Sequence, residues 1–471
     1  MSTFAQAVAA QTTTTTNGAK AYTSTLSAAV DLFFKIGASR GKNIISDFTA
    51  AYVENPDVAL RIAQWARDVR GGSGERQIFR DILQHLENSA PADAQRLINN
   101  IPEIGRWDDL LVLTNPLLKQ HAFGLIKVAL EAGNGLCAKW MPRKGKVAEE
   151  LRAFLGYSPK RYRKTLVTLT QVVETQMCAQ QWDEIEFGKV PSVAAARYKK
   201  AFNRNAPETF AAYADALSKG EAKVNAGAVF PYDVLKGAFS QYGRNSMPLP
   251  ERQHAIAQWA ALENFVGDAS VLPMVDVSGS MYCPAGGHNS KSNVTCMQVA
   301  VSLGLYLAEK NTGAFKDTFL TFTDQPKLYN LKGDVFQKMD QMTGKVGYST
   351  NIQAAFREVL RVAVEGKVAQ ADMPANIVIL SDMQFDQVSR DDATAFDMIR
   401  EEYKAAGYDA PRIVFWNLNA HGNVPTRFNQ SGVALVSGFS PAIAKTVLKA
   451  ENFDPMNIML QAVMVDRYTL A

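Results

Sequence analysis

Two hydrophobic patterns divide the chain. In the first, apolar side chains recur at helical spacing, as in residues 57–70, and polar breaks such as the glycine-rich residues 71–74 separate short helical segments. Strand-like alternation is nearly absent there. In the second, short apolar runs alternate with helical patterns. We therefore predict a multidomain protein, with an all-α helical repeat of irregular, HEAT-like kind over residues 20–267 and an α/β domain over residues 268–471.

The second pattern predicts a mostly parallel, doubly wound sheet, because its strands alternate with helices. Sheets of this kind bind ligands beyond the carboxyl ends of their strands, where the strand order reverses. Polar residues that directly follow a strand are therefore the first candidates for a binding site. The strands are expected in residues 271–275, 317–323, 376–380, 412–418 and 433–437.

The first 19 residues show neither pattern. They contain five consecutive threonines, Thr12 to Thr16, followed by Asn17 and Gly18. This stretch offers no apolar face that could be buried, so we expect a flexible amino-terminal segment over residues 1–19.

The composition is that of a soluble globular protein with reduced thiols. A chain of 471 residues exceeds the roughly 250–300 residues that one hydrophobic core supports, which agrees with at least two domains. No apolar run approaches the ~18 residues of a membrane span, and the start of the chain lacks the features of a signal peptide. The four cysteines form no C-x-x-C pair, which suggests neither a zinc site nor a disulfide framework. We expect a cytoplasmic protein without a membrane partner.

The charge is distributed unevenly between the two halves. Residues 268–471 hold 18 Lys and Arg against 21 Asp and Glu, a net charge of −3. That leaves 32 against 25, a net charge of +7, in residues 1–267. The two halves are therefore expected to meet different partners.

The positive charge of the first half is concentrated in residues 139–164. This stretch holds nine Lys and Arg against only Glu149 and Glu150, with three aromatic residues interleaved. Such a surface neutralises backbone phosphates, and its aromatic rings can stack on unpaired bases. A solvated helix face with the rings turned into the core explains the composition equally well. The residues that we assign to RNA binding are Lys139, Arg143, Lys144, Lys146, Lys160, Arg161, Arg163, Lys164, Arg197, Lys199 and Lys200.

Five oxygen-bearing residues in the second half follow or precede predicted elements at the same edge of the sheet. Asp276, Ser278 and Ser280 come directly after one strand, Asp382 follows another, and Thr350 lies in a loop that opens a helix. Carboxylate and hydroxyl oxygens suit Mg²⁺, which commonly keeps several waters. The alternative is a set of polar loop residues that holds no ion.

This set resembles the metal-ion-dependent adhesion site of von Willebrand factor type A domains, whose pattern is D-x-S-x-S, then a Thr, then an Asp. The resemblance implies that Ser278, Ser280 and Thr350 coordinate Mg²⁺ directly or through water. It also implies that Asp276 and Asp382 supply charge and orient waters. A partner's acidic residue could then replace one of the waters.

Three stretches of the first half resemble the TROVE-domain proteins, the Ro autoantigen and its bacterial and phage relatives. They are residues 60–74 (LRIAQWARDVRGGSG), residues 104–110 (IGRWDDL) and residues 139–143 (KWMPR). The order of a helical half and a von Willebrand A domain resembles that family too. The resemblance implies a ring of helices that binds structured small RNAs on its outer basic surface and takes single-stranded ends of misfolded RNAs through its hole.

Three classes of function stay open. The first is a non-enzymatic RNA-binding component of a ribonucleoprotein, with small non-coding or single-stranded RNA as its partner and a Mg²⁺-dependent docking site for an acidic residue of a protein partner. The second is a protein-protein scaffold that uses the same metal site and binds no RNA. The third is an enzyme of metal-assisted hydrolysis, for which the sequence offers no positioned general base.

Overall fold

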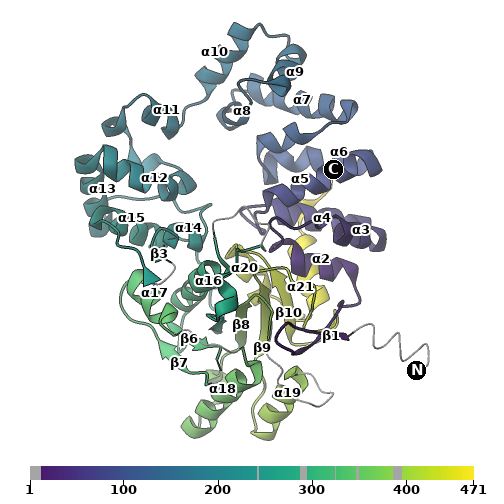
Figure 1. The fold of residues 1–471 in the computed structure, drawn as a ribbon, viewed down its shortest axis with the longest axis vertical. Coiled ribbons are helices and arrows are strands. Elements are labelled where there is room, and N and C mark those ends of the chain that lie inside the picture. Colours follow the sequence, from purple (N-terminus) through teal and green to yellow (C-terminus); the bar gives the residue numbers. More distant parts are fainter. Residues whose placement is uncertain are drawn as a thin grey trace.

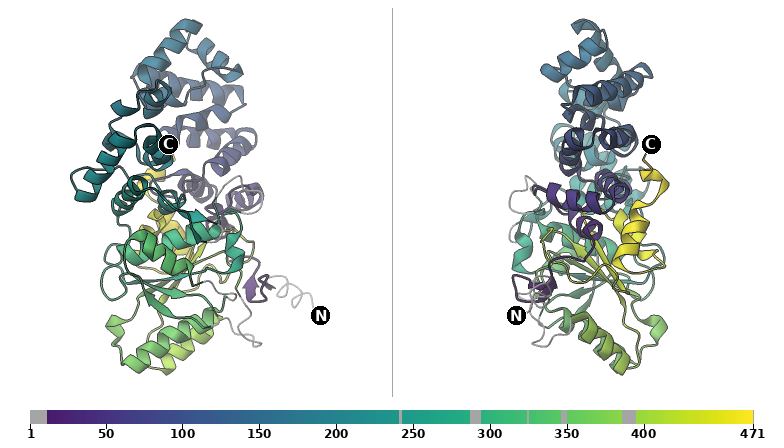
Figure 2. Two further views of the ribbon diagram at one scale, coloured as in Figure 1. Left: turned by 60° about the vertical axis from the view of Figure 1, so that its left-hand side comes forward. Right: turned by 90° about the vertical axis from the view of Figure 1, so that its right-hand side faces the viewer.

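The computed structural model describes residues 12–240, 243–286, 294–323, 325–345, 350–385 and 395–470. Figure 1 shows an arc of helices above an α/β domain, and both ends of the arc rest on that domain. Figure 2 shows the same arc from two other sides, with the α/β domain again at its base. No described helix is long and apolar enough to cross a membrane.

The first half is helical, as the periodicity predicts. Several helices begin with a proline in the first turn and a side-chain cap just before it, such as Asn55 before α4 and Asn115 before α7. The helices are α2 (Ala28–Ile36), α3 (Ile45–Glu54), α4 (Pro56–Arg67), α5 (Arg76–Ser89), α6 (Pro91–Ile104), α7 (Pro116–Glu131), α8 (Gly135–Trp140), α9 (Lys146–Phe154), α10 (Pro159–Leu169), α11 (Val173–Cys178), α12 (Ser192–Asn205), α13 (Pro207–Lys219), α14 (Pro231–Leu235) and α15 (Leu249–Ala260). A 3₁₀ turn, η1 (Trp107–Val112), precedes α7, and a short strand pair, β3 (Phe239–Ser240) and β4 (Gly243–Arg244), precedes α15. The helical prediction is confirmed, and its HEAT-like character stays a prediction.

The amino-terminal segment is not flexible over residues 12–19, so that prediction is wrong for this part, while residues 1–11 lie outside the described residues. β1 (Thr12–Thr14) pairs antiparallel with β2 (Lys20–Tyr22). Threonine favours strands because it is β-branched, and Gly18 takes the positive φ of +89° that the connecting turn requires. Tyr22 also pairs with Val424, far along the chain. The hairpin is therefore held by the α/β domain.

The second half forms a six-stranded sheet in the order β10-β9-β8-β5-β6-β7. All pairs are parallel except the edge strand β7, which pairs antiparallel with β6. The strand order reverses at β5, since β6 lies on one side of it and β8 on the other. The strands are β5 (Val271–Val275), β6 (Thr318–Thr321), β7 (Leu328–Asn330), β8 (Asn376–Ser381), β9 (Arg412–Asn417) and β10 (Val433–Ser437), and the helices are α16 (Cys296–Lys310), α17 (Val335–Thr343), α18 (Ile352–Gly366), α19 (Ala395–Ala405), α20 (Ala442–Leu448) and α21 (Pro455–Val463). The predicted doubly wound sheet is confirmed, with β7 as an additional strand.

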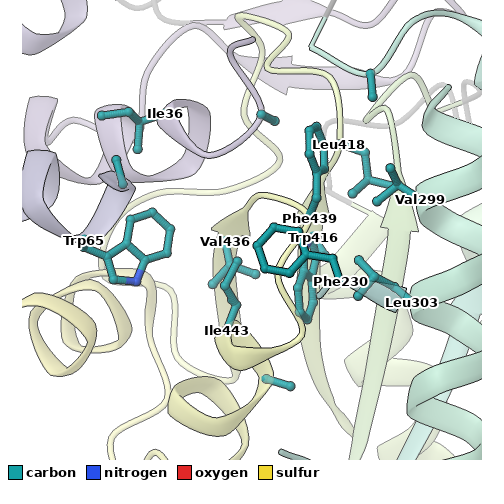
Figure 3. Packing of buried hydrophobic residues seen from close by; sticks show 14 of the residues in the cluster. Ile36, Trp65, Phe230, Val299, Leu303, Trp416, Leu418, Val436, Phe439 and Ile443 are labelled. Carbon is teal, nitrogen blue, oxygen red and sulfur yellow. The ribbon is translucent and has the colours of Figure 1, made fainter. Parts of the chain in front are cut away.

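One hydrophobic core runs through both halves. Figure 3 shows members of it from the helical half, such as Ile36, Trp65 and Phe230, and from the α/β domain, such as Trp416 and Val436. A second, smaller core lies among α11, α12, α13 and the segments that connect them. It consists of Val173, Ile185, Phe187, Val190, Ala195, Phe202, Ala206 and Phe210. The two halves are therefore not separate globules joined by a linker.

Hydrogen bonds between residues about 400 positions apart lock α2 onto β10. The Gly37 amide donates to Ser437 Oγ at 3.0 Å, and that hydroxyl donates to the Phe33 carbonyl at 2.8 Å. A side chain at position 37 would have no room, because its Cβ would lie 2.3 Å from the Ser437 carbonyl oxygen. At the other chain end, Tyr468 donates to Asp68 of the helical half at 3.0 Å. Helix α2 and the segment around Tyr468 thus each pack on the opposite half.

Arg40 lies where the two ends of the arc and the α/β domain meet. Its Nε donates to Glu75 at 2.7 Å, its guanidinium contacts the Tyr232 hydroxyl at 3.4 Å, and it lies 4.4 Å from the ring centre of Phe439. Glu75 precedes α5, Tyr232 is in α14, and Phe439 follows β10. Burial lowers the pKa of Arg40, but Glu75 and Tyr232 outweigh it and raise that pKa above its ordinary value. The arc therefore closes on itself through a charged contact.

Replacing Arg40 should destabilise the protein strongly. Arg40→Met leaves the Glu75 carboxylate buried without its cation, so we expect the free energy of unfolding to fall by about 3 kcal/mol. Chemical denaturation followed by circular dichroism measures this change. Arg361→Met is the control, because Arg361 makes its ion pairs with Glu358 and Glu365 on an exposed helix face. Equal stability of Arg40→Met and the control would contradict the role given to Arg40.

Candidate metal centre and nucleic-acid interface

The structure brings the five predicted metal-site residues to one edge of the sheet. Asp276 directly follows β5 and Asp382 directly follows β8, and these strands are parallel neighbours. Ser278 and Ser280 lie at the start of a 3₁₀ turn, η4 (Gly279–Tyr282). Thr350 lies just before the cap of α18. This edge is the point of strand-order reversal, where doubly wound sheets bind their ligands.

Hydrogen bonds order the D-x-S-x-S turn. The Ser278 amide donates to Asp276 Oδ1 at 3.0 Å, and the hydroxyls of Ser278 and Ser280 lie 3.1 Å apart. The other oxygen, Asp276 Oδ2, accepts from the hydroxyl of Ser381 at 2.7 Å. Ser381 is a residue that the sequence pattern did not single out. Its position at the end of β8, one residue before Asp382, is the signal that could have found it.

Gln384 links the remaining two residues. The Thr350 hydroxyl donates to the Gln384 carbonyl at 2.9 Å, and the Gln384 amide donates to Asp382 Oδ1 at 3.2 Å. Met383, which lies between Asp382 and Gln384 in the sequence, has a φ of +66°. This conformation costs a non-glycine residue about 1 kcal/mol or more. The turn after β8 is therefore held in a strained shape that points Asp382 to the same edge.

Two carboxyl groups share this buried edge. Asp276 is fully buried and Asp382 is nearly so. Burial and the nearby charge of Asp382 raise the pKa of Asp276 to about 6. A divalent cation would offset this repulsion. Two carboxylates and three hydroxyls fit a hard cation such as Mg²⁺, with waters completing its shell.

The rest of the described chain offers no competing metal cluster. Within the described ranges, no group of three or more His, Cys, Asp or Glu residues could hold a metal ion. A cation at this edge would therefore depend on hydroxyl ligands. Three further polar candidates, His288, Asp324 and Asp386, lie outside the described residues.

The amino-terminal hairpin covers part of this edge. The Thr16 amide donates to Gln384 Oε1 at 2.7 Å, and Asn17 donates to the Gln384 carbonyl at 2.9 Å. Between hairpin and edge lies a polar cavity of about 310 Å³. Its lining consists of Thr13, Thr14, Thr16, Thr23, Gln384, His421, Gly422 and Asn423. The threonine run thus belongs to the surroundings of the candidate metal centre.

Most of the predicted RNA-binding residues are exposed around α8, α9 and α10. This part of the arc lies farthest from the sheet (Figure 1). Lys139 is half-buried, 3.4 Å from Glu174. Arg197 and Lys200 are exposed on α12. The exposed residues of the first group are Arg143, Lys144, Lys146, Lys160, Arg161, Arg163 and Lys164.

Lys199 is a correction, because it lies inside the protein. Its side chain is 3% exposed and donates to the Val234 carbonyl at 2.9 Å. Burial lowers the pKa of Lys199 to about 8. The predicted phosphate contact is therefore wrong for Lys199. Helix α14 covers the end of the Lys199 side chain, and composition alone does not reveal this burial.

The aromatic residues of residues 139–164 differ in burial, and burial decides whether a ring can stack on a base or belongs to the core. Tyr162 is buried and donates to the Pro142 carbonyl at 3.0 Å, so it belongs to the core. Trp140 is half-buried, with the guanidinium of Arg106 lying 3.5 Å from its ring centre. Tyr157 is half-buried too, and Arg161 lies 4.1 Å from its ring centre. Stacking on bases is thus open to Tyr157 and Trp140 and closed to Tyr162.

The three motif stretches of the first half meet in one charged cluster. Asp109, fully buried, accepts from Arg67 and from Arg80, each at 2.7 Å. Arg106 pairs with Asp108 and stacks on Trp140. The cluster joins α4, α5, η1 and α8, so these motif residues position the basic helices.

Comparisons with known proteins place the chain in a family. Residues 15–111 and 141–270 match the family model "Domain of unknown function (DUF2828)", and residues 270–467 match "Domain of unknown function (DUF7788)". The chain is 30% identical over 510 aligned positions to "Uncharacterized protein L728" of Acanthamoeba polyphaga mimivirus, which covers 95% of this chain and 86% of that protein. This chain belongs to the same family as the mimivirus protein. The alignment that shows this family membership covers nearly the whole chain.

Among solved structures, the chain is similar to the crystal structure of the Deinococcus radiodurans Ro (RSR) protein. The two are 14% identical with a TM-score of 0.46, over 93% of this chain and 99% of that chain. A likeness of this degree carries no argument about function. The resemblance to TROVE proteins therefore rests on the motif stretches and on the order of the two halves.

Removing one carboxylate from the candidate metal centre should stabilise the metal-free protein but end its stabilisation by a cation. Asp382→Asn keeps the acceptor for Gln384 but ends the repulsion with Asp276. We expect it to stabilise the metal-free protein by about 1 kcal/mol and to abolish stabilisation by Mg²⁺ or Mn²⁺. Thermal unfolding with EDTA and with each cation measures both effects.

The matched control is Asp372→Asn, an exposed aspartate on the same domain. It should unfold like the unmodified protein with and without the cation. An equal Mg²⁺-dependent rise of the unfolding midpoint in Asp382→Asn would show that no cation binds at this edge.

Proposed function

We propose that this protein is a non-enzymatic RNA-binding component of a ribonucleoprotein, similar in this respect to Ro proteins. Its partner is small non-coding RNA or the single-stranded end of an RNA. The basic residues exposed around α8, α9 and α10 bind the phosphates. In this proposal the protein acts in the cytoplasm, and no catalytic step is involved.

The observation that carries the proposal is a gathering of exposed cations, several of which make no ion pair. Within the described part of the chain, Lys144, Lys160, Arg163 and Lys164 make no ion pair. Lys146 has only a distant partner, with Nζ 4.0 Å from Glu150. Some exposed cations elsewhere are paired with a carboxylate three or four positions away, such as Lys219 with Asp215, Lys189 with Glu186 and Arg361 with two glutamates. Unpaired cations gathered in one place favour a polyanion, which releases counterions on binding.

The chemistry suits an RNA whose sequence is not read. Lysine and arginine contacts to phosphate fix position but carry little base information. Tyr157 and Trp140 offer ring surface beside these cations, and stacking on a ring tolerates every base. The expected ligand is therefore an unpaired RNA segment.

The metal centre supports a second part of the proposal. Two buried carboxylates with hydroxyls at the sheet edge would hold Mg²⁺, and an acidic side chain of a protein partner would complete its shell. If RNA does not bind, this docking site favours the alternative function, a protein-protein scaffold. A pull-down with Mg²⁺ against EDTA, with Asp382→Asn as the negative control, separates the two: in the scaffold case, partners are lost with the chelator and RNA is ignored.

Neutralising three cations of α10 should weaken RNA binding and its salt dependence. For Lys160→Gln, Arg163→Gln and Lys164→Gln combined, we expect the slope of log affinity against log salt to become shallower by about 2, since each single-strand phosphate contact contributes roughly 0.7. Fluorescence anisotropy of a labelled single-stranded RNA at several salt concentrations measures it. Affinity at low salt should fall at least tenfold.

The control removes three exposed lysines from the α/β domain instead, by Lys404→Gln, Lys445→Gln and Lys449→Gln. It should bind RNA like the unmodified protein. The proposal is wrong if the unmodified protein shows no saturable binding at low salt. An equal loss in both triple variants would move the interface away from α10.

A further inference from the structure

Two cysteines lie face to face beside the candidate metal centre. Cys283 directly follows η4 and Cys296 is the first residue of α16, 13 positions later. Their sulfur atoms are 3.5 Å apart. The backbone holds them there, since the Cys296 amide donates to the Cys283 carbonyl at 3.0 Å and Pro284 pairs antiparallel with Thr295. Both thiols are free.

The surroundings favour a reactive thiolate at Cys283. Asn419 Nδ2 donates to Cys283 Sγ at 3.3 Å, and the Lys42 ammonium is held nearby on the Ala420 carbonyl at 3.1 Å. The hydrogen bond with Cys296 lowers the pKa of Cys283, and Lys42 acts in the same direction. That hydrogen bond and burial raise the pKa of Cys296. Within the pair, the pKa is therefore lowered at Cys283 and raised at Cys296.

The two cysteines also differ in exposure to solvent. Cys283 is half-buried, while Cys296 is fully buried and its Sγ lies 3.4 Å from the Leu418 carbonyl. A small oxidant can therefore meet Cys283 but not Cys296. Cys296 can meet only Cys283. This is the arrangement of an attacking and a resolving cysteine.

We propose that Cys283 and Cys296 are an oxidative modification site, which a low-molecular-weight disulfide such as glutathione disulfide converts to a reversible intramolecular disulfide. The Cys283 thiolate attacks one sulfur of the oxidant, forms a mixed disulfide and releases one glutathione thiolate. The Cys296 thiol then loses its proton and attacks Cys283 Sγ, which expels the second glutathione thiolate. Two protein thiols are oxidised, the two electrons reduce one glutathione disulfide to two glutathiones, and the two protons end on them.

The bond would tie the turn after Ser280 to the first residue of α16. The charges of Asp276 and Asp382 act on Cys296, so the modification site and the candidate metal centre are electrostatic neighbours. Oxidation would fix this edge of the sheet in one shape. The inference stands on the geometry of the thiols and is independent of RNA binding.

The test uses the full chain with Cys178→Ser, which removes the exposed thiol that could link two molecules. The protein is equilibrated in glutathione buffers of increasing disulfide content, remaining thiols are alkylated, and the products are analysed by mass spectrometry. Trypsin cuts after Lys291, between the two cysteines, so a disulfide joins peptides 253–291 and 292–310. We expect the joined peptides to appear at the expense of two alkylation sites and to separate again with dithiothreitol. Cys137, buried with a raised pKa, should stay reduced as the internal control.

Cys296→Ala identifies the order of events. Without the resolving thiol, Cys283 should accumulate as a stable glutathione adduct that the parent protein does not retain. The proposal is overturned if the parent protein keeps this adduct without joined peptides, or if both thiols stay reduced. Thiols protected by a zinc ion in the purified protein would overturn it too. Should Cys296→Ala fail to fold, the joined peptides of the parent protein decide alone.

Discussion

The architecture depends on the contact of Arg40 with Glu75, Tyr232 and Phe439. These residues come from the first end of the helical arc, its last end and the α/β domain, which a single guanidinium holds together. Buried ions are costly unless they are paired, so this contact tolerates few alternative arrangements. It joins the segment after α2 to the start of α5, to α14 and to the turn after β10, at the place where the arc meets the sheet. The basic helices at the far side of the arc and the candidate metal centre at the sheet edge are positioned by the same constraint.

Much of the fold follows from local pattern. Amphipathic helices bury one face and therefore show their period, and fully buried strands such as β8 appear as continuous apolar runs. β7 gave no signal because it is three residues long and only partly buried. The hairpin of residues 12–22 escaped prediction because Gln384 and Val424, which hold it, lie hundreds of positions away. Its turn signal, Asn17 followed by Gly18, was present but outweighed by the polar composition.

In the candidate sites, too, local pattern could predict some residues, while others depend on tertiary packing. Asp276 and Asp382 could be placed together because carboxyl ends of parallel strands share an edge, a rule that needs no tertiary detail. Gln384 and Ser381 could not, since their roles arise from a turn with a positive φ at Met383. Lys199 has the same composition context as Lys200, and only packing against α14 separates a buried lysine from an exposed one. Likewise, no spacing rule brings Cys283 to Cys296; the paired backbone between η4 and α16 does.

The central claim is that unpaired cations on the far side of the arc bind RNA. Ultraviolet cross-linking of a bound single-stranded RNA, followed by mass spectrometry of the cross-linked peptides, tests it most directly. The account predicts cross-links in residues 139–164, with Tyr157 and Trp140 as the preferred sites because rings that stack on bases cross-link most readily. Cross-links confined to residues 268–471 would contradict it.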